Sequence, residues 1–474
     1  MATLREDAEA LWQAAFAAVA PERLVTERLT MEGDQLLLDR APLDPPVHLG
    51  HARRMVVVGG GKAAAGLATG LEQLLPTTLP VSGLIGVPEG CGVQLPRLEV
   101  REVRPAGRNE PTEACVAATR EMLAMLSALS HDDLAIAVVT GGGSAILTAP
   151  RPGIPLEEIA ATTRWLSEHG ATIRELNKVR QALSDVKAGG MARGCGAGRL
   201  VVLAISDVIG DPLETISSGP CMPVLVAPAD ALAILERFGA TTAGIAPAIV
   251  AFLQTAAASS PAGQREPQSD SAPGRWRTPR GCKVSHHLLA SNDTALNAAA
   301  AEASRRGYQL RVRPANPASS ETADEVGARL AAEGCEAVHS GLRERLAILE
   351  GGEATVHLPE GHGLGGRNQQ SVVAALASAC RQEGWPEGLL VASLGTDGED
   401  GPTQAAGGVA DAEVAATITT RGLSLADAVQ RCDASPLLAA AGGLIHTGPT
   451  GTNVADLRMV LVDSRPQTSQ AATA

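Results

Sequence analysis

The sequence predicts an α/β protein of two domains, with parallel strands in the N-terminal one. At 474 residues the chain is long enough for two or three domains. A buried strand runs into three glycines and then a helix twice, in Arg54–Glu72 and in Leu134–Leu147. Two such units in one domain indicate parallel strands joined by right-handed crossovers. Residues 256–281 are rich in proline, serine and charge, and they separate the two halves as a flexible linker.

Hydrophobic periodicity places the elements of the first half. We expect strands that alternate with helices, after an N-terminal helix within Leu4–Arg40. The expected strands are Gln35–Leu38, Met55–Val58, Val81–Val87, Leu98–Val103, LAIAVVT from Leu134, and Leu200–Ile205, and the expected helices include Glu113–Leu129 and Leu156–Leu176.

The second half repeats this alternation after the linker. Its expected strands are Val284–Ala290, Arg345–Leu349, Glu353–Leu358 and Leu389–Leu394, and its expected helices are Thr294–Arg306 and Gln369–Ala379. The predicted domain ranges are therefore 1–255 and 282–463, with the linker at 256–281 and a disordered tail at 464–474.

Composition excludes several classes of protein. The net charge of −13 argues against a nucleic-acid or membrane partner. No stretch reaches the roughly 18 uninterrupted apolar residues of a membrane span. The acidic N-terminus reads as a helix rather than a signal peptide. Eight cysteines without a CxxC pair suggest neither a zinc site nor a disulfide framework, so we expect a cytoplasmic protein.

The first glycine turn has the composition of an anion site. Gly60, Gly61 and Lys62 lie where a helix begins, and unpaired amides and the helix dipole favour negative charge there. Only four of the 39 basic residues are lysines, so lysine is expected where a compact ammonium is needed, as against a phosphoryl group. The turn matches neither GxGxxG with a ribose-binding acid nor GxxxxGK[ST]. A phosphate or carboxylate site and an ordinary βα turn therefore both remain open.

Later segments add polar groups at the ends of strands. GGGS at residues 141–144 repeats the opening turn, and Lys187 lies in a patch of cations and amides near another glycine pair. Asp207 and Asp211 follow the strand Leu200–Ile205, at the end where ligands bind in α/β sheets. In the second half, Arg367 and Asn368 follow a glycine-rich turn.

Together these groups suit phosphoryl transfer. Arg367 offers phosphate a planar charged fork, and Asp397, in the acidic turn GTDGEDGPT, suits Mg²⁺. A nicotinamide dehydrogenase is a second reading, but Glu89 is a poor match to the acid expected about 20 residues after the turn. A non-catalytic protein that binds a small ligand is a third.

Eight motifs follow one another along the chain: VVVGGGKAAAG, VTGGGSAIL, LNKVRQALSDVKAGG, ISDVIGDPLETISSGP, LEGGEATV, GHGLGGRNQQ, SLGTDGEDGPTQAAGG and HTGPTGTNVADL. Together and in this order they resemble the glycerate 2-kinase family whose C-terminal part is the MOFRL domain. The resemblance implies a larger Rossmann-like N-terminal domain, a smaller α/β MOFRL-like domain, and an active site in the cleft between them. It implies transfer of the γ-phosphoryl group of ATP to the 2-hydroxyl of D-glycerate, with Mg²⁺ or another divalent metal. ATP and D-glycerate are then the partners, and a homo-oligomer is allowed.

The resemblance also implies roles for single residues. Lys62 and Arg367 are the essential cations, and Asp207 orients or deprotonates the acceptor hydroxyl. The positions implied for substrate or phosphate are Gly60, Gly61, Gly141, Gly142, Gly143, Ser144, Lys187 and Asn368. Those implied for a metal or the nucleotide are Asp211, Asp397 and Asn453.

Two loops depart from the family pattern. GRNEPT replaces the expected GHPxPD, so that Arg108 and Thr112 stand for a histidine and an aspartate. SET at Ser320–Thr322 replaces an expected GEA. If the first loop shapes the acceptor pocket, the substrate is a different small hydroxy acid. Some relatives carry the label hydroxypyruvate reductase, which is the name that the dehydrogenase alternative would bear.

Overall fold

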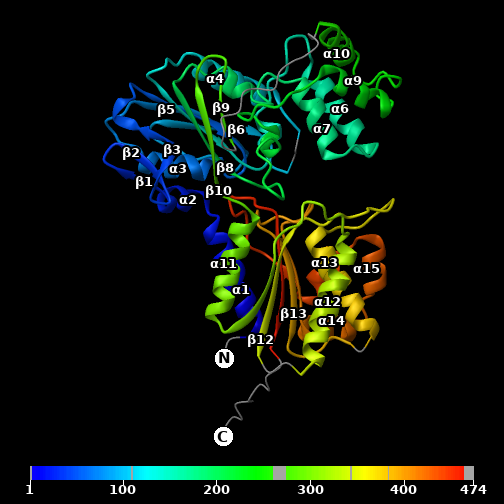
Figure 1. Ribbon diagram of the computed structural model, residues 1–474. Helices are drawn as coiled ribbons and strands as arrows, with labels where there is room; N and C mark the ends of the chain where they lie inside the picture. The colour runs from blue at the N-terminus through cyan, green and yellow to red at the C-terminus, as the bar shows by residue number, and fades with distance from the viewer. Residues whose placement is uncertain (1–2, 108–109, 260–273, 342–343, 383, 464–474) are drawn as a thin grey trace. The chain divides into compact units, whose positions relative to one another are not determined.

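The structure is a computed structural model that describes residues 3–107, 110–259, 274–341, 344–382 and 384–463. It divides into two compact units. The central unit is Pro21–Leu289, and the terminal unit combines Met1–Ala20 with Ala290–Ala474. Figure 1 gives the labels of the helices and strands.

The central unit is built on a seven-stranded sheet in the order β6-β5-β4-β7-β8-β10-β9. Strands β4 to β8 pair in parallel. The bounds are β4 Met55–Gly60, β5 Val81–Pro88, β6 Leu98–Arg104, β7 Leu134–Val139, β8 Arg199–Ile205, β9 Arg275–Arg277 and β10 Lys283–Ala290. Every residue of β4 is buried, as expected of a parallel strand covered on both faces.

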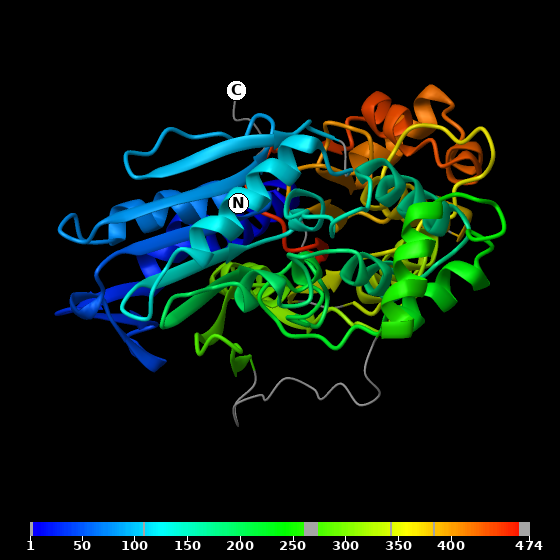
Figure 2. The same cartoon turned by 90° about the horizontal axis from the view of Figure 1, so that it is seen from above.

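Helices and a small second sheet complete the central unit. The three-stranded sheet is β1 Leu29–Glu32, β2 Gln35–Leu38 and β3 Ala41–His48. The helices are α2 Pro21–Arg28, α3 Ala64–Leu74, α4 Glu113–Ser127, α5 Gly143–Ile146, α6 Leu156–Glu168, α7 Ile173–Ala182, α8 Gly190–Arg193, α9 Pro228–Arg237 and α10 Pro247–Ser259, with 3₁₀ turns η1 Leu49–His51 and η2 Ile216–Ser218. Figure 2 shows α4 along the strands of this sheet. Met122 and Leu126 of α4 belong to the same buried core cluster as Val58 and Leu84.

The terminal unit has a six-stranded sheet in the order β11-β12-β16-β13-β14-β15. Only β11 and β12 pair in parallel among its described strands. The strands are β11 Tyr308–Arg313, β12 Arg345–Gly352, β13 Leu389–Gly395, β14 Gly407–Ala410, β15 Leu444–Ile445 and β16 Asp456–Val462. The helices are α1 Leu4–Ala18, α11 Asn292–Arg305, α12 Ala323–His339, α13 Arg367–Gln382, α14 Ala412–Arg421, α15 Leu425–Arg431 and α16 Ala434–Ala441.

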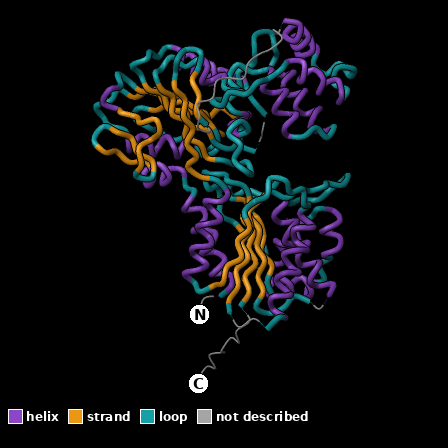
Figure 3. Tube along the Cα trace, viewed as in Figure 1, coloured by secondary structure: helices purple, strands orange, loops and turns teal. Residues whose placement is uncertain are grey.

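Helices cover both faces of this second sheet. Figure 3 shows α1 and α11 on one face, with α12 and α13 on the other. Helix α1 is anchored by Asp7, which is 1% exposed and accepts hydrogen bonds from Arg306, Tyr308 and Arg345. Burial alone raises the pKa of Asp7, but the hydrogen bonds of these three residues hold the pKa below its ordinary value.

The α/β class and the opening strand–turn–helix unit are confirmed, as β4 and α3 show. The expected single helix Leu156–Leu176 is wrong. It is α6 and α7, interrupted where Gly170 has a φ of 81° and Thr172 caps α7. The expected strand Glu353–Leu358 is also wrong, since Thr355 forms only an isolated bridge with Thr322.

The units divide the chain at other positions than the expected ranges 1–255 and 282–463. The pairing of β9 with β10 extends the first sheet, so residues up to Leu289 belong to the central unit. Of the expected linker, 256–259 are the end of α10 and Arg275–Arg277 are β9, while 260–273 lie outside the described residues. The expected tail, 464–474, also lies outside them. No described helix is long and apolar enough to cross a membrane.

Candidate active site

The two glycine turns of the central unit touch each other. At the end of β4, Gly61 has a φ of 134°, which glycine adopts at little cost. The backbone amide of Lys62 donates to the carbonyl of Gly141 at 2.8 Å. The next amide, of Ala63, donates to the Thr140 hydroxyl at 3.2 Å. The parallel pairing of β4 with β7 thus brings together two turns that are far apart in the sequence.

Lys62 and Asp207 lie against neighbouring residues of the second turn. A Cβ atom on Gly141 would lie 2.5 Å from Oδ2 of Asp207, and one on Gly142 would lie 3.4 Å from Cγ of Lys62. Asp207 follows β8 and is half-buried, as is Lys62. The next helical turn begins only at Ile216, so Asp207 caps no helix. The predicted cation and carboxylate therefore meet at one turn, beside Gly60 and Gly61.

A network of hydroxyl groups supports this turn. The hydroxyls of Ser144 and Ser218 lie 3.0 Å apart, and Ser218 donates to Asn177 at 3.1 Å. Ser217 donates to the carbonyl of Thr140 at 2.8 Å. Ser217 and Ser218 have φ angles of 52° and 63°, which cost about 1–3 kcal/mol each for residues other than glycine. In the sequence, the motif ISSGP marks the position of Ser217 and Ser218. It does not show their strained φ angles or their hydrogen bonds, because the partners lie far away in the sequence.

Lys187 is buried behind Ser144. It is 4% exposed, and its Nζ donates to the carbonyls of Ser144 at 2.6 Å and Leu147 at 3.2 Å. Burial, with a smaller effect of the nearby Arg180, lowers the pKa of Lys187 to about 7. Asp211 lies four residues after Asp207 with a φ of 54°, and its amide donates to the carbonyl of Val208.

In the terminal unit, Arg367 begins α13 and is held by two carboxylates. Its Nε and Nη2 donate to Asp456 at 2.6 and 2.9 Å, and Nη2 also donates to Glu353 at 2.7 Å. Asp456 is 1% exposed and pairs with Gly352 and Gly395 in the sheet. Arg367 and its two partners therefore lie together at one edge of the sheet, meaning the end where β12 and β13 finish and β16 begins. Asp456 and Glu353 were not predicted as partners of Arg367.

Asn368 is buried and hydrogen-bonded to other residues of the terminal unit. It is 2% exposed, its backbone and side-chain amides donate to Asp400 at 3.0 and 3.2 Å, and its Oδ1 accepts from the Ser393 hydroxyl. Asp400 also accepts from the amide of Gln369, so a carboxylate of the chain already occupies the start of α13. Burial raises the pKa of Asp400 to about 6 despite these hydrogen bonds. These contacts favour a supporting role for Asn368 over the predicted phosphate contact.

The two remaining candidates lie in loops near the same edge. Oδ1 of Asp397 accepts from the amide of Glu399 at 3.1 Å and lies against Gly395. Oδ1 of Asn453 accepts from the amide of Ala455 at 3.1 Å. Among the described residues, no group of three or more His, Cys, Asp or Glu side chains is placed to hold a metal ion.

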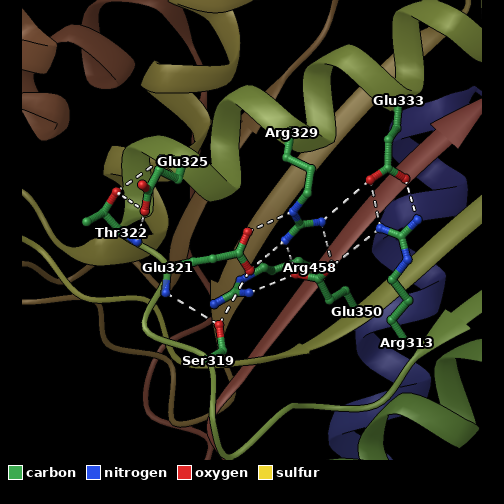
Figure 4. Close-up of polar contacts among 9 residues, drawn as sticks. All are labelled: Arg313, Ser319, Glu321, Thr322, Glu325, Arg329, Glu333, Glu350 and Arg458. Carbon is green, nitrogen blue, oxygen red and sulfur yellow. Dashed lines mark hydrogen bonds and ion pairs between the residues drawn. The ribbon is translucent and has the colours of Figure 1, made fainter.

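Ion pairs connect β12, which ends just before Glu353, with β16, which begins at Asp456. Figure 4 shows Arg329 between Glu321 and Glu350, with Arg458 also on Glu350. Arg313 donates to both oxygens of Glu333 in the same cluster. The cluster lines a cavity of about 370 Å³. Each arginine of this cavity faces a carboxylate, so its charges are compensated within the protein.

Both departures from the family pattern include a residue that caps a helix. Thr112 caps α4 by accepting from the amide of Cys115, and Thr322 caps α12 in the same way with Glu325. Thr322 is a better N-cap than the expected alanine, whereas Thr112 replaces an aspartate that caps at least as well, so capping does not explain the change at Thr112. Arg108 lies outside the described residues.

Two family matches cover most of the chain. Residues 7–254 match a family described as a domain of unknown function, DUF4147, and residues 346–456 match the MOFRL family. The second match confirms the predicted MOFRL-like C-terminal part.

Relatives and solved structures are similar to this chain over nearly its whole length. Glycerate kinase from Homo sapiens is 33% identical and aligns with 98% of this chain and 94% of its own. D-glycerate 2-kinase from Thermotoga maritima is 32% identical over 94% of this chain and 95% of its own. The crystal structure of glycerate kinase from T. maritima has a TM-score of 0.76 at 30% identity, covering 97% of this chain and 99% of that one. A protein from Pyrococcus horikoshii OT3 has a TM-score of 0.78 at 28% identity, covering 98% and 100%. The chain therefore belongs to the glycerate kinase family.

Proposed function

We propose that this enzyme transfers the γ-phosphoryl group of ATP to the 2-hydroxyl of D-glycerate, giving 2-phosphoglycerate and ADP. The observation that carries the proposal is the meeting of Lys62 and Asp207 at the turn Gly141–Gly142. The ammonium of Lys62 stabilises charge on the moving phosphoryl group. Asp207 orients the acceptor hydroxyl, since a loose transfer asks little of a base. The names of the human and T. maritima relatives support this reaction.

Arg367 supplies a second cation in this proposal. Its Nη1 takes no part in the bonds to Asp456 and Glu353, and 36% of its side chain is exposed. A guanidinium held by two carboxylates keeps its orientation while presenting its remaining N–H groups to phosphate oxygens. Burial opposes its charge, but Asp456 and Glu353 raise the pKa of Arg367, so it stays charged at any physiological pH.

The residues at this edge fit Mg²⁺ that arrives with the nucleotide. Mg²⁺ usually takes one or two protein carboxylates and completes its shell with phosphates and water. Asp456 is committed to Arg367, so we propose Asp397 as the carboxylate that holds the metal. When bound, the metal neutralises charge on the phosphates. Asn453 and Asp211 remain weaker candidates for contacts with the nucleotide.

One experiment separates the proposal from the reductase alternative. ADP release is measured with D-glycerate and ATP, and nicotinamide absorbance is measured with hydroxypyruvate and NADH or NADPH. The proposal expects ADP release alone, and Lys62→Ala should lose it. Consumption of NADH or NADPH without ADP release would establish the reductase instead.

A panel of small 2-hydroxy acids tests the acceptor. D-glycerate should have the highest kcat/KM, and a higher value for another acid would replace it as the substrate. We also propose a cytoplasmic location, since the eight cysteines of the sequence are scattered singly without a CxxC pair, which suits a reducing compartment.

A further inference from the structure

A second cavity, of about 340 Å³, lies in the central unit beside the second glycine turn. Ser144 lines it from the turn, and Arg180, of α7, and Lys187 line it from the segments that follow. Glu110 and Pro111 contribute from the GRNEPT loop. The loop that departs from the family pattern therefore forms part of this wall.

Within the described residues, two cations of this cavity have no counter-charge. The partners of Lys187 Nζ, at 2.6 and 3.2 Å, are neutral carbonyl oxygens. Arg180 is half-buried, and no hydrogen bond or ion pair joins it to another residue in the described part of the chain. Burial lowers the pKa of Arg180 as well as that of Lys187.

The other arginines that line this cavity and the cavity beside the ion pairs of Figure 4 have carboxylate partners. Arg164 also lines this cavity, but it donates to Glu110 at 2.9 Å, and both side chains are more than half exposed. In the cavity of Figure 4 every arginine faces a glutamate. Burying two positive charges without a negative partner is costly. The presence of both Arg180 and Lys187 in this cavity therefore indicates that an anion from outside the chain binds there.

We propose that this cavity binds the carboxylate of the acceptor hydroxy acid, with Arg180 and Lys187 as its ligands and Glu110–Pro111 as the wall that selects the acceptor. The proposal rests on the kinase function proposed above. A guanidinium fork matches a carboxylate in two parallel bonds. Ser144 is two residues from Gly142, at most about 7 Å of chain. An acid held here therefore has its hydroxyl near the turn that Lys62 and Asp207 flank.

The test uses the full chain and the variant Arg180→Gln, with Arg174→Gln, at an exposed position of the same helix α7, as the matched control. Calorimetry without nucleotide measures the binding of D-glycerate, of its uncharged amide and of inorganic phosphate. Arg180→Gln should weaken D-glycerate binding about 10- to 100-fold, as expected for the loss of a charge-assisted bond, and leave the amide unchanged. In steady-state assays the KM for D-glycerate should rise as much, while the KM for ATP changes less than twofold. Arg174→Gln should stay within twofold of the parent throughout.

Two results would overturn the inference. One is unchanged D-glycerate affinity in a folded Arg180→Gln protein. The other is phosphate binding that Arg180→Gln abolishes while D-glycerate binding persists, which would make the cavity a phosphate site. If Arg180→Gln does not fold, Arg180→Lys keeps the charge without the fork and should give an intermediate loss; parental affinity there would refute bidentate recognition.

The same measurements separate this inference from the proposed function. Arg180-dependent binding of D-glycerate without any ADP release would refute the kinase and keep the binding site. Normal ADP release with an unchanged KM for D-glycerate in Arg180→Gln would refute the binding site alone.

Discussion

Arg367→Ala is expected to destabilise the terminal unit as well as to reduce turnover. Asp456 is 1% exposed, and Arg367 donates to both of its carboxylate oxygens. Truncation of the arginine leaves a buried carboxylate without its cation, which costs about 3–5 kcal/mol. Glu353 contributes little to this loss because its side chain is 43% exposed and returns to water. The expected loss is comparable to the whole stability of a marginal domain.

The double variant Arg367→Ala/Asp456→Asn isolates the cause. It removes the uncompensated charge, so it should recover more than half of the lost free energy of unfolding.

Hydrogen exchange of the amides in β12, β13 and β16 measures the opening free energy of this unit directly. Arg421→Ala, at an exposed position at the end of α14, serves as the control and should change it by less than about 0.5 kcal/mol. Parental exchange in Arg367→Ala at pH 7 would show that Asp456 does not depend on this arginine, and the reasoning would fail.

Three further changes test other parts of the structure. Lys62→Ala should lower kcat about 100- to 1,000-fold with an unchanged melting temperature, in the assay of ADP release; near-parental turnover would remove Lys62 from catalysis. The pKa of Lys187 falls from 10.5 to about 7 on folding, so the unfolded chain binds the extra proton between these values. The free energy of unfolding of the parent, measured with urea and without ligand, should therefore rise with pH across this range. Relative to Lys187→Met, the rise should reach about 1.4 kcal/mol per pH unit. The same pH dependence of this free energy in the parent and in Lys187→Met would contradict the prediction. Asp7→Asn should cost about 3 kcal/mol because its arginine partners lose a buried carboxylate, whereas Glu9→Gln on the exposed face of α1 should cost almost nothing; equal losses would refute the anchoring role.

The local parts of the fold and the site could be predicted from the sequence. Strands such as β4 and β7 are apolar runs that lead into glycine turns, and an uninterrupted apolar run is the pattern of a parallel strand buried on both faces. The carboxyl ends of such strands meet at one edge, and Lys62 and Asp207 lie there as expected.

Partners distant in the sequence could not be predicted. Nothing near Arg367 indicates that Asp456 and Glu353 hold it, because these contacts depend on the register of β16 with β12 and β13. The unpaired charge of Arg180 has the same origin, since a sequence does not show which cations fold away from carboxylates. The assignment of β10 to the first sheet also depends on pairing rather than on its own composition.

The position of α1 has a consequence for how this protein is made. Helix α1 is synthesised before the central unit, but Ala8 and Leu11, which are fully buried in the finished protein, pack in a unit whose other elements follow residue 289. The apolar face of α1 therefore stays exposed or chaperoned until these later elements have emerged from the ribosome. A fragment that starts at residue 290 would lack the Asp7 anchor and expose the surface of α11 that α1 covers. We expect such a fragment to aggregate unless the first 20 residues are supplied, as a separate peptide or by fusion.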